Sequence, residues 1–183
     1  MKPFLKVFAI VLTIAYPFII YFGLLHFQAS SLIPLLLLLL GLRWFGSQKN
    51  SERYLVMAIA IILAMISLAL GSQLGLKFYP VLVNFGFLVL FAGSLLFPPS
   101  IVERMVRIRD PDLSPRAIIY IRKVTWLWSV FFVINGSIAT VTALWASNEV
   151  WTLYNGFIAY LLIGLLAGGE WLVRQRVMRD QQN

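Results

Sequence analysis

Long apolar runs separated by short polar intervals make up most of this chain. The runs predict membrane-spanning helices at about residues 4–25, 29–44, 54–71, 78–97, 124–146 and 150–171. Most of them approach the roughly 20 residues that a helix needs to cross the hydrocarbon core of a bilayer. The pattern therefore predicts an all-α polytopic membrane protein, in which residues 1–183 form a single integral membrane domain.

Two of these runs carry features that change the simple picture. Pro17 lies inside the first run and predicts a kink there. The second run is the shortest and could either cross as a thin span or begin as a re-entrant turn at Ser30 and Ser31. A full crossing is favoured, because the distribution of charge along the chain requires it.

Basic residues alternate between the two ends of the predicted spans. The N-terminus, the loop between spans 2 and 3, residues 98–123 and the C-terminal tail hold two, three, six and three of the fifteen Lys and Arg residues. The three intervening loops hold only one, Lys77. Because positive charge marks the cytoplasmic side, six spans with both termini in the cytoplasm are predicted. The chain is therefore predicted to cross a membrane several times.

Composition excludes several classes of function. The chain is 61% hydrophobic and 12% charged, against about 25% charged residues in soluble domains. It has no cysteine and one histidine, which excludes disulfides, thiolate metal sites and histidine clusters. The net charge of +8 is explained by membrane topology, and no basic–aromatic motif for nucleic acid is present. No cofactor and no metal site are predicted.

The longest polar interval, residues 98–123, predicts two helices with a break between them. Apolar and charged positions alternate at helical spacing over residues 101–108. Pro111 breaks this helix, and Ser114 before Pro115 predicts the N-cap and first position of the next. The interval is therefore predicted to lie on the cytoplasmic surface as an amphipathic helix–break–helix. Its candidate surface for anionic lipid headgroups or a partner protein consists of Arg104, Arg107, Arg109, Arg116, Arg122 and Lys123.

Other interpretations of this interval stay open. Its charges could serve only as topology anchors on a solvated face. Asp110 and Asp112 could hold Mg²⁺ or a diphosphate, although the longer acidic motifs of membrane prenyl- and phosphatidyl-transferases are absent. Glu103 and Arg107 have the spacing of a helical ion pair.

A few polar residues lie inside the predicted spans. The candidate polar pocket consists of Asn84, Asn135, Tyr154 and Asn155, and Glu149 and His26 could join it. The alternative is that these amides form hydrogen bonds that hold helices together. Glu170 and Arg174 are predicted to form an interfacial ion pair. The sequence has no acid at midplane depth, which argues against a proton-coupled pump.

From Lys77 to about Arg176 the chain resembles the bacterial intracellular septation protein A family. The resemblance rests on an apolar span followed by PPSIVERM, on Trp126 and Trp128, and on Asn135. The segment ERMVRIRDPDLSP and the two spans after it also resemble related small membrane proteins found at aryl-polyene and fatty-acid-like biosynthetic loci.

This resemblance implies a multi-pass location in the bacterial inner (cytoplasmic) membrane. It also implies a non-enzymatic role in cell-envelope biogenesis or septation, or in the pathway of an associated lipid-like product. The implied partners are membrane lipids and envelope-biogenesis or biosynthetic proteins. An alternative is a small transporter or flippase for a lipid-linked or polyene product, which predicts that Asn84, Asn135 and Asn155 converge on one cavity. A membrane enzyme would have only Asp110, Asp112 and Glu170 as candidate acids.

Overall fold

The computed structural model describes residues 3–46, 50–108 and 110–179. Every regular element in these residues is a helix. In chain order they are α1 (Pro3–His26), the 3₁₀ turn η1 (Ala29–Leu32), α2 (Ile33–Gly46), α3 (Asn50–Leu70), α4 (Ser72–Lys77), α5 (Tyr79–Leu96), α6 (Ile101–Arg107), α7 (Pro115–Trp145), α8 (Asn148–Leu153), the π-helical turn η2 (Tyr154–Ile158) and α9 (Ala159–Arg179).

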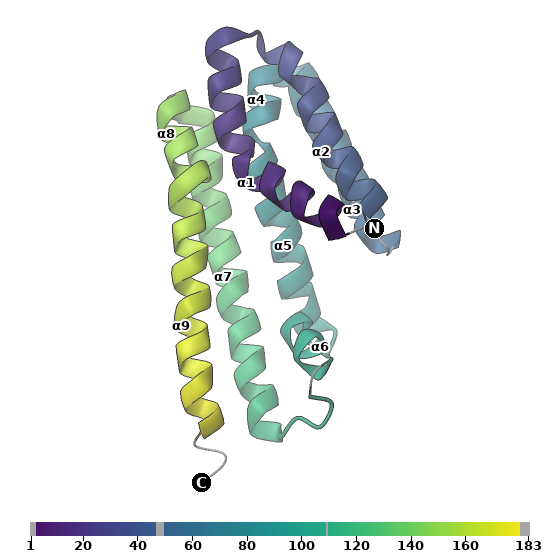
Figure 1. Cartoon of the computed structure of the whole chain (residues 1–183), viewed down its shortest axis with the longest axis vertical. Coiled ribbons are helices and arrows are strands. Elements are labelled where there is room, and N and C mark those ends of the chain that lie inside the picture. Colours follow the sequence, from purple (N-terminus) through teal and green to yellow (C-terminus); the bar gives the residue numbers. More distant parts are fainter. Residues whose placement is uncertain (1–2, 47–49, 109, 180–183) are drawn as a thin grey trace.

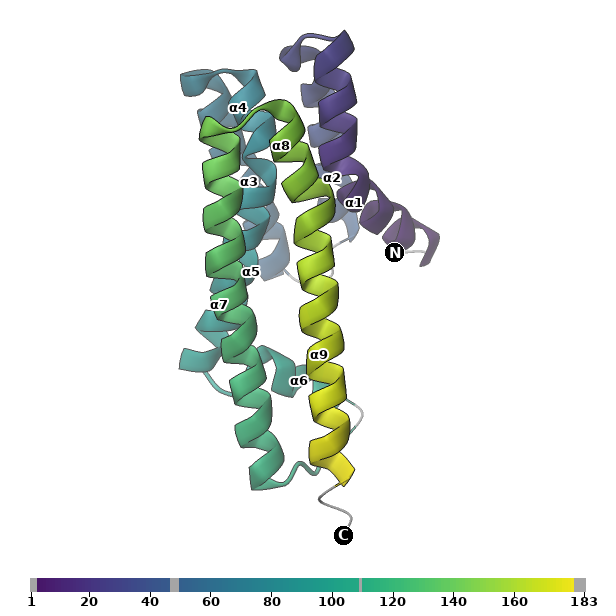
Figure 2. The same ribbon diagram turned by 90° about the vertical axis from the view of Figure 1, so that its left-hand side faces the viewer.

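The helices form an elongated bundle. α5, α7 and α9 run along its long axis, and α1, α2 and α3 lie beside one part of its length (Figure 1). α7 and α9 lie side by side and are joined at one end through α8, while α6 lies near the other end (Figure 2). α1 is bent, and the proline inside it is Pro17. The kink predicted for this helix is therefore present.

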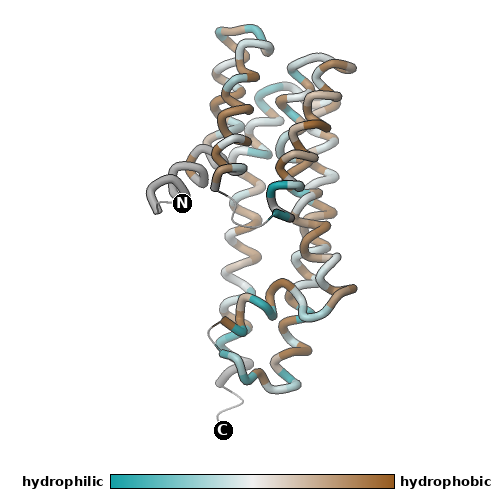
Figure 3. The backbone as a smooth tube through the Cα atoms, turned by 90° about the vertical axis from the view of Figure 1, so that its right-hand side faces the viewer, coloured by the Kyte–Doolittle hydropathy of each residue, from teal (hydrophilic) through white to brown (hydrophobic). Residues whose placement is uncertain are grey.

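Three helical stretches of the described residues are long and apolar enough to cross a membrane. They are Tyr79–Leu96, Pro115–Trp145 and Asn148–Gln175. The apolar stretches of the N-terminal half are shorter, at Ala15–His26, Ala29–Leu42 and Val56–Leu70. Apolar residues recur along these helices (Figure 3). Each of the six predicted runs thus corresponds to a helix, and the all-helical membrane architecture agrees with the sequence.

The second helix predicted after Pro111 continues into the predicted fifth span. α7 is one continuous helix of 31 residues that begins at Pro115 and includes both segments. Ser114 is its N-cap as predicted, and its hydroxyl accepts a hydrogen bond from the Ala117 amide at 3.2 Å. The two segments merge because no proline or glycine interrupts the stretch between Pro115 and the membrane. Only α6 is a separate short helix between α5 and α7.

α5 packs closely along α7, and aromatic rings fill the contact. Phe132 of α7 stacks on Phe87 of α5 and meets Phe91 edge to face, with both pairs of ring centroids 5.2 Å apart. A Cβ atom on Gly136 would lie 3.2 Å from the Cβ atom of Asn84. The glycine therefore allows the close approach that brings the embedded amides of these two helices together.

At the end of the bundle formed by α4 and α8, side chains bind the backbone of neighbouring helices. The Tyr16 hydroxyl donates to the Leu76 carbonyl at 3.0 Å, and Trp151 Nε1 donates to the Lys77 carbonyl at 3.2 Å. Tyr16, Leu76 and Trp151 are almost completely buried. The Tyr16 contact joins α1 to α4 within the N-terminal half, and the Trp151 contact joins α8 of the C-terminal half to α4.

Candidate functional site

Three predicted pocket residues form one hydrogen-bonded chain across three elements. Asn135 Nδ2 of α7 donates to Asn84 Oδ1 of α5 at 2.9 Å, and the Tyr154 hydroxyl of η2 donates to Asn135 Oδ1 at 2.8 Å. Asn84 Nδ2 donates to the Pro80 carbonyl at 2.9 Å. All three side chains are buried. We call Asn84, Asn135, Tyr154 and Asn155 the amide cluster.

Asn155 completes the cluster with partners of its own. Its Nδ2 atom donates to Thr142 Oγ1 at 3.2 Å and to the Trp151 carbonyl at 2.9 Å. Thr142 was not predicted as a site residue. Thr142 lies seven residues after Asn135, which places both on one face of α7. This spacing is the sequence signal that could have predicted Thr142 as a member of the site.

The three asparagines of the amide cluster border one cavity of about 230 Å³ between α1, α5, α7 and α9. The convergence predicted by the transport hypothesis is therefore present. Tyr154 does not line the cavity, but its hydroxyl donates a hydrogen bond to Asn135, which does. Aromatic residues that were not predicted complete the lining, among them Tyr16, Tyr79, Phe87, Phe132 and Tyr160.

The π-helical turn η2 lies against α1 because Gly156 has no side chain. A Cβ atom there would lie 2.9 Å from the Phe18 ring. The turn carries Tyr154 and Asn155, whose side chains bind α7. A π-turn widens the helix locally and is frequent at functional sites. Here it orients two members of the amide cluster.

Glu149 and His26 do not join the amide cluster. Glu149 is exposed in α8. His26 Nδ1 lies 3.0 Å from the Phe22 carbonyl of its own helix, beside a different cavity between α1 and η1. Both residues lie near the ends of their helices, so hydropathy alone did not place them relative to the asparagines.

A second cavity, of about 410 Å³, lies where α5, α6 and α7 meet, and we call it the charged cavity. Buried hydroxyl groups shape its wall. Thr125 Oγ1 donates to Ser100 Oγ at 3.1 Å, and the Ile101 amide donates to Ser94 Oγ at 2.9 Å. Ser100 is also the N-cap of α6. The sequence signal that would have revealed this cap is Ser-x-x-Glu, ending at Glu103.

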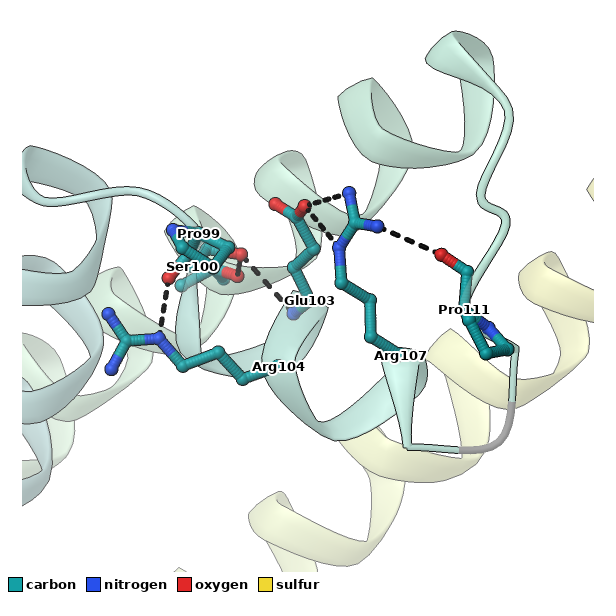
Figure 4. A network of polar contacts seen from close by, with 7 residues as sticks. Pro99, Ser100, Glu103, Arg104, Arg107 and Pro111 are labelled. Carbon is teal, nitrogen blue, oxygen red and sulfur yellow. Dashed lines mark hydrogen bonds and ion pairs between the residues drawn. The ribbon is translucent and has the colours of Figure 1, made fainter.

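The predicted pair of Glu103 and Arg107 forms and borders the charged cavity. Arg107 Nη2 and Nε donate to Glu103 Oε1 at 2.7 and 2.9 Å, and Arg107 Nη1 donates to the Pro111 carbonyl at 3.0 Å (Figure 4). The side chain of Glu103 is 10% exposed. The arginine therefore links α6 to the turn that follows it.

Of the remaining described residues of the predicted basic surface, one lines the charged cavity and three do not. Arg122 lines the charged cavity, and its Nη2 atom donates to the Leu95 carbonyl at 3.4 Å. Arg104 lies outside the cavity lining and binds the Pro99 and Phe97 carbonyls at 2.8 and 3.2 Å. These four residues, Arg104, Arg116, Arg122 and Lys123, are all exposed. Arg109 lies outside the described residues.

The ion pair predicted for Glu170 and Arg174 does not form in the described part of the chain. Instead, the Tyr120 hydroxyl of α7 lies 3.4 Å from Glu170 Oε1 and 3.3 Å from the Glu170 carbonyl. An exposed ion pair within one helix has little net stability. A neighbouring helix that offers a donor therefore competes with it.

The carboxylates of the described residues do not gather around a possible metal site. Among residues 3–46, 50–108 and 110–179, no group of three or more His, Asp or Glu residues could hold a metal ion. Asp110 and Asp112 are exposed on the turn after α6.

Comparison with known proteins identifies relatives that match most of the chain. A protein of Marinomonas sp. strain MWYL1 named inner membrane-spanning protein YciB is 24% identical over 166 residues, which cover 85% of this chain and 91% of the relative. A protein of the same name from Yersinia enterocolitica is 27% identical over 151 residues, which cover 80% and 81%. The chain is a distant homologue of these YciB proteins.

A third YciB protein, from Hydrogenovibrio crunogenus, is 25% identical over 135 residues, which cover 71% of this chain and 61% of the relative. The predicted resemblance to the intracellular septation protein A family is confirmed by these homologues. The predicted location, a multi-pass protein of the inner membrane, is confirmed by them together with the membrane-length helices. No family model and no solved structure matches the chain.

Proposed function

We propose that this protein is a non-enzymatic component of cell-envelope biogenesis or septation in the bacterial inner membrane. In this proposal residues 1–183 form one membrane domain with six spans and both termini in the cytoplasm. The charge distribution along the sequence supports that topology. The similarity to YciB proteins over most of the chain supports the envelope role.

The observation that carries the proposal is the form of the segment between α5 and α7. α6 is a short helix held at both ends by side-chain contacts, and it exposes Met105 and Ile108 next to Arg104. Exposed apolar and basic side chains on one short helix suit the boundary between lipid and water. With the proposed topology, this helix meets anionic headgroups or a partner protein at the cytoplasmic surface.

A reporter inserted after Asp112 tests the topology, and complementation of a gene deletion tests the role. The variant Arg104→Gln/Arg116→Gln/Lys123→Gln removes three exposed charges, none of which lines either cavity. We expect it to reach wild-type membrane levels and fail to restore septation or envelope integrity. Arg174→Gln, on α9, is the matched control and should restore both. A periplasmic reporter, or full rescue by the triple variant, would contradict the proposal.

A second candidate function is transport of a lipid-linked or polyene product. The convergence of Asn84, Asn135 and Asn155 on one cavity favours it. Proteoliposomes loaded with a fluorescent lipid-linked substrate would measure its movement between leaflets. Movement equal to that in protein-free liposomes would eliminate this candidate.

A further inference from the structure

The charged cavity holds polar atoms that the protein itself leaves available. Both donors from Arg107 go to Oε1 of Glu103, and in the described part of the chain the second oxygen, Oε2, accepts no hydrogen bond. Arg122 uses one of its five N–H groups, in a long contact with the Leu95 carbonyl. The cavity therefore presents one carboxylate oxygen and one guanidinium that have capacity for a ligand.

These atoms define the chemistry of the ligand. A guanidinium is the preferred partner of a phosphate, which it binds through two donors. A carboxylate oxygen with one free acceptor site binds a primary ammonium by a charge-assisted hydrogen bond. We infer that the charged cavity binds the phosphoethanolamine headgroup of a membrane phospholipid, with its phosphate on Arg122 and its ammonium on Glu103 Oε2.

The surroundings indicate a lipid and not a soluble phosphate ester. Leu95, Pro98 and Ile118 give the cavity an apolar side, and the neighbouring Leu96 and Phe97 are 76% and 74% exposed. Exposed apolar side chains at the end of a membrane-length helix suit acyl chains. The volume of about 410 Å³ lies within the usual range for ligand cavities.

The carboxylate also discriminates between headgroups. A phosphoglycerol headgroup has no cation for Glu103, whose negative charge would face the phosphate. A phosphocholine headgroup carries a quaternary ammonium, which has no N–H to donate to Oε2. Only a headgroup with both a phosphate and a primary ammonium satisfies both sides of the cavity. This inference rests on the proposed function, whose topology puts the charged cavity in the cytoplasmic leaflet.

Native mass spectrometry of the delipidated full-length protein tests the inference. The protein is incubated with phosphatidylethanolamine, phosphatidylglycerol or phosphatidylcholine of identical acyl chains, and with glycerophosphoethanolamine or inorganic phosphate. We expect phosphatidylethanolamine to be retained about tenfold better than the other two lipids, which is the size of one charge-assisted hydrogen bond. Glu103→Gln should remove this preference, and Arg122→Gln should weaken retention of every phospholipid.

Arg174→Gln is the matched control, because Arg174 is exposed on α9, does not line the cavity and lies outside the proposed headgroup surface. It should bind all three lipids as the wild type does. Arg122→Gln leaves the pair of Glu103 and Arg107 intact, so it tests the site even if Glu103→Gln fails to fold. Thermal unfolding in detergent verifies the fold of each variant.

Equal retention of the three lipids by the wild type would overturn the inference, and so would an unchanged preference in Glu103→Gln. Binding of inorganic phosphate as strong as that of the lipid would replace the lipid site with a soluble-phosphate site. These outcomes are independent of complementation by the triple variant. A protein that fails here can still act in envelope biogenesis, and one that binds the lipid can still fail to rescue the deletion.

Discussion

The amide cluster is buried, whereas the charged cavity includes the exposed Arg122, and the two sites also differ in how many of their polar atoms are hydrogen-bonded within the protein. In the amide cluster, asparagine side chains bind one another, a tyrosine, a threonine and backbone carbonyls. In the charged cavity, Glu103 Oε2 and most of the Arg122 guanidinium have no partner in the described part of the chain.

This difference indicates different roles. Polar groups that satisfy one another within the membrane hold helices together, because separating them would leave each unpaired in hydrocarbon. Groups with spare donors and acceptors gain more from a ligand than from the protein. The comparison predicts that the amide cluster contributes mainly to stability and the charged cavity mainly to binding.

The largest expected effect is that of Asn135→Leu. This change leaves Asn84 Oδ1 and the Tyr154 hydroxyl without their partner, and should lower the free energy of unfolding by about 1–3 kcal/mol. Denaturant unfolding followed by circular dichroism would measure it. Ser137→Ala is the control, because Ser137 is exposed on the same helix and binds only its own backbone. Wild-type stability of Asn135→Leu would break the comparison.

A smaller loss of stability is expected for Glu103→Gln. Its partner Arg107 is 39% exposed, so solvent screens the ion pair and its contribution is about 0.5–1 kcal/mol. The same unfolding measurement applies. If this change destabilised the protein as much as Asn135→Leu, the charged cavity would be a structural element and the contrast between the two sites would disappear.

The smallest expected effect is a dependence of stability on alkaline pH. Burial lowers the pKa of Lys77, at the end of the bundle opposite α6, and the nearby Glu149 only partly offsets this. The pKa of a lysine in the unfolded chain is about 10.4. Between the two pKa values the unfolded chain binds more protons, so stability should rise as pH rises through that window.

Thermal unfolding at a series of pH values would measure this rise. Lys77→Met should remove it, and Lys123→Met, which changes an exposed lysine, should keep it. A rise of the same size in all three proteins would assign it to other groups. A rise specific to Lys77 would show that burial of this charge, at the end of the bundle away from α6, lowers the stability of the folded protein.

Local features of the two sites could be predicted from the sequence. Glu103 and Arg107 pair because a helix places residues four apart on one face. Ser114 caps α7 because its hydroxyl reaches the amide three residues on. α7 continues past Arg122 and Lys123, where the second helix was predicted to enter the membrane, because no proline or glycine interrupts it there.

The sequence by itself determined the apolar runs, the all-helical architecture and the alternation of basic residues between successive loops, because each follows from hydropathy and spacing within short segments. Only the tertiary structure decided which polar groups meet. Asn84 and Asn135 are 51 residues apart, and their contact depends on how α5 and α7 are rotated about their axes and how closely Gly136 lets them approach. The sequence of one helix defines its polar face, and the packing of its neighbours decides what that face contacts.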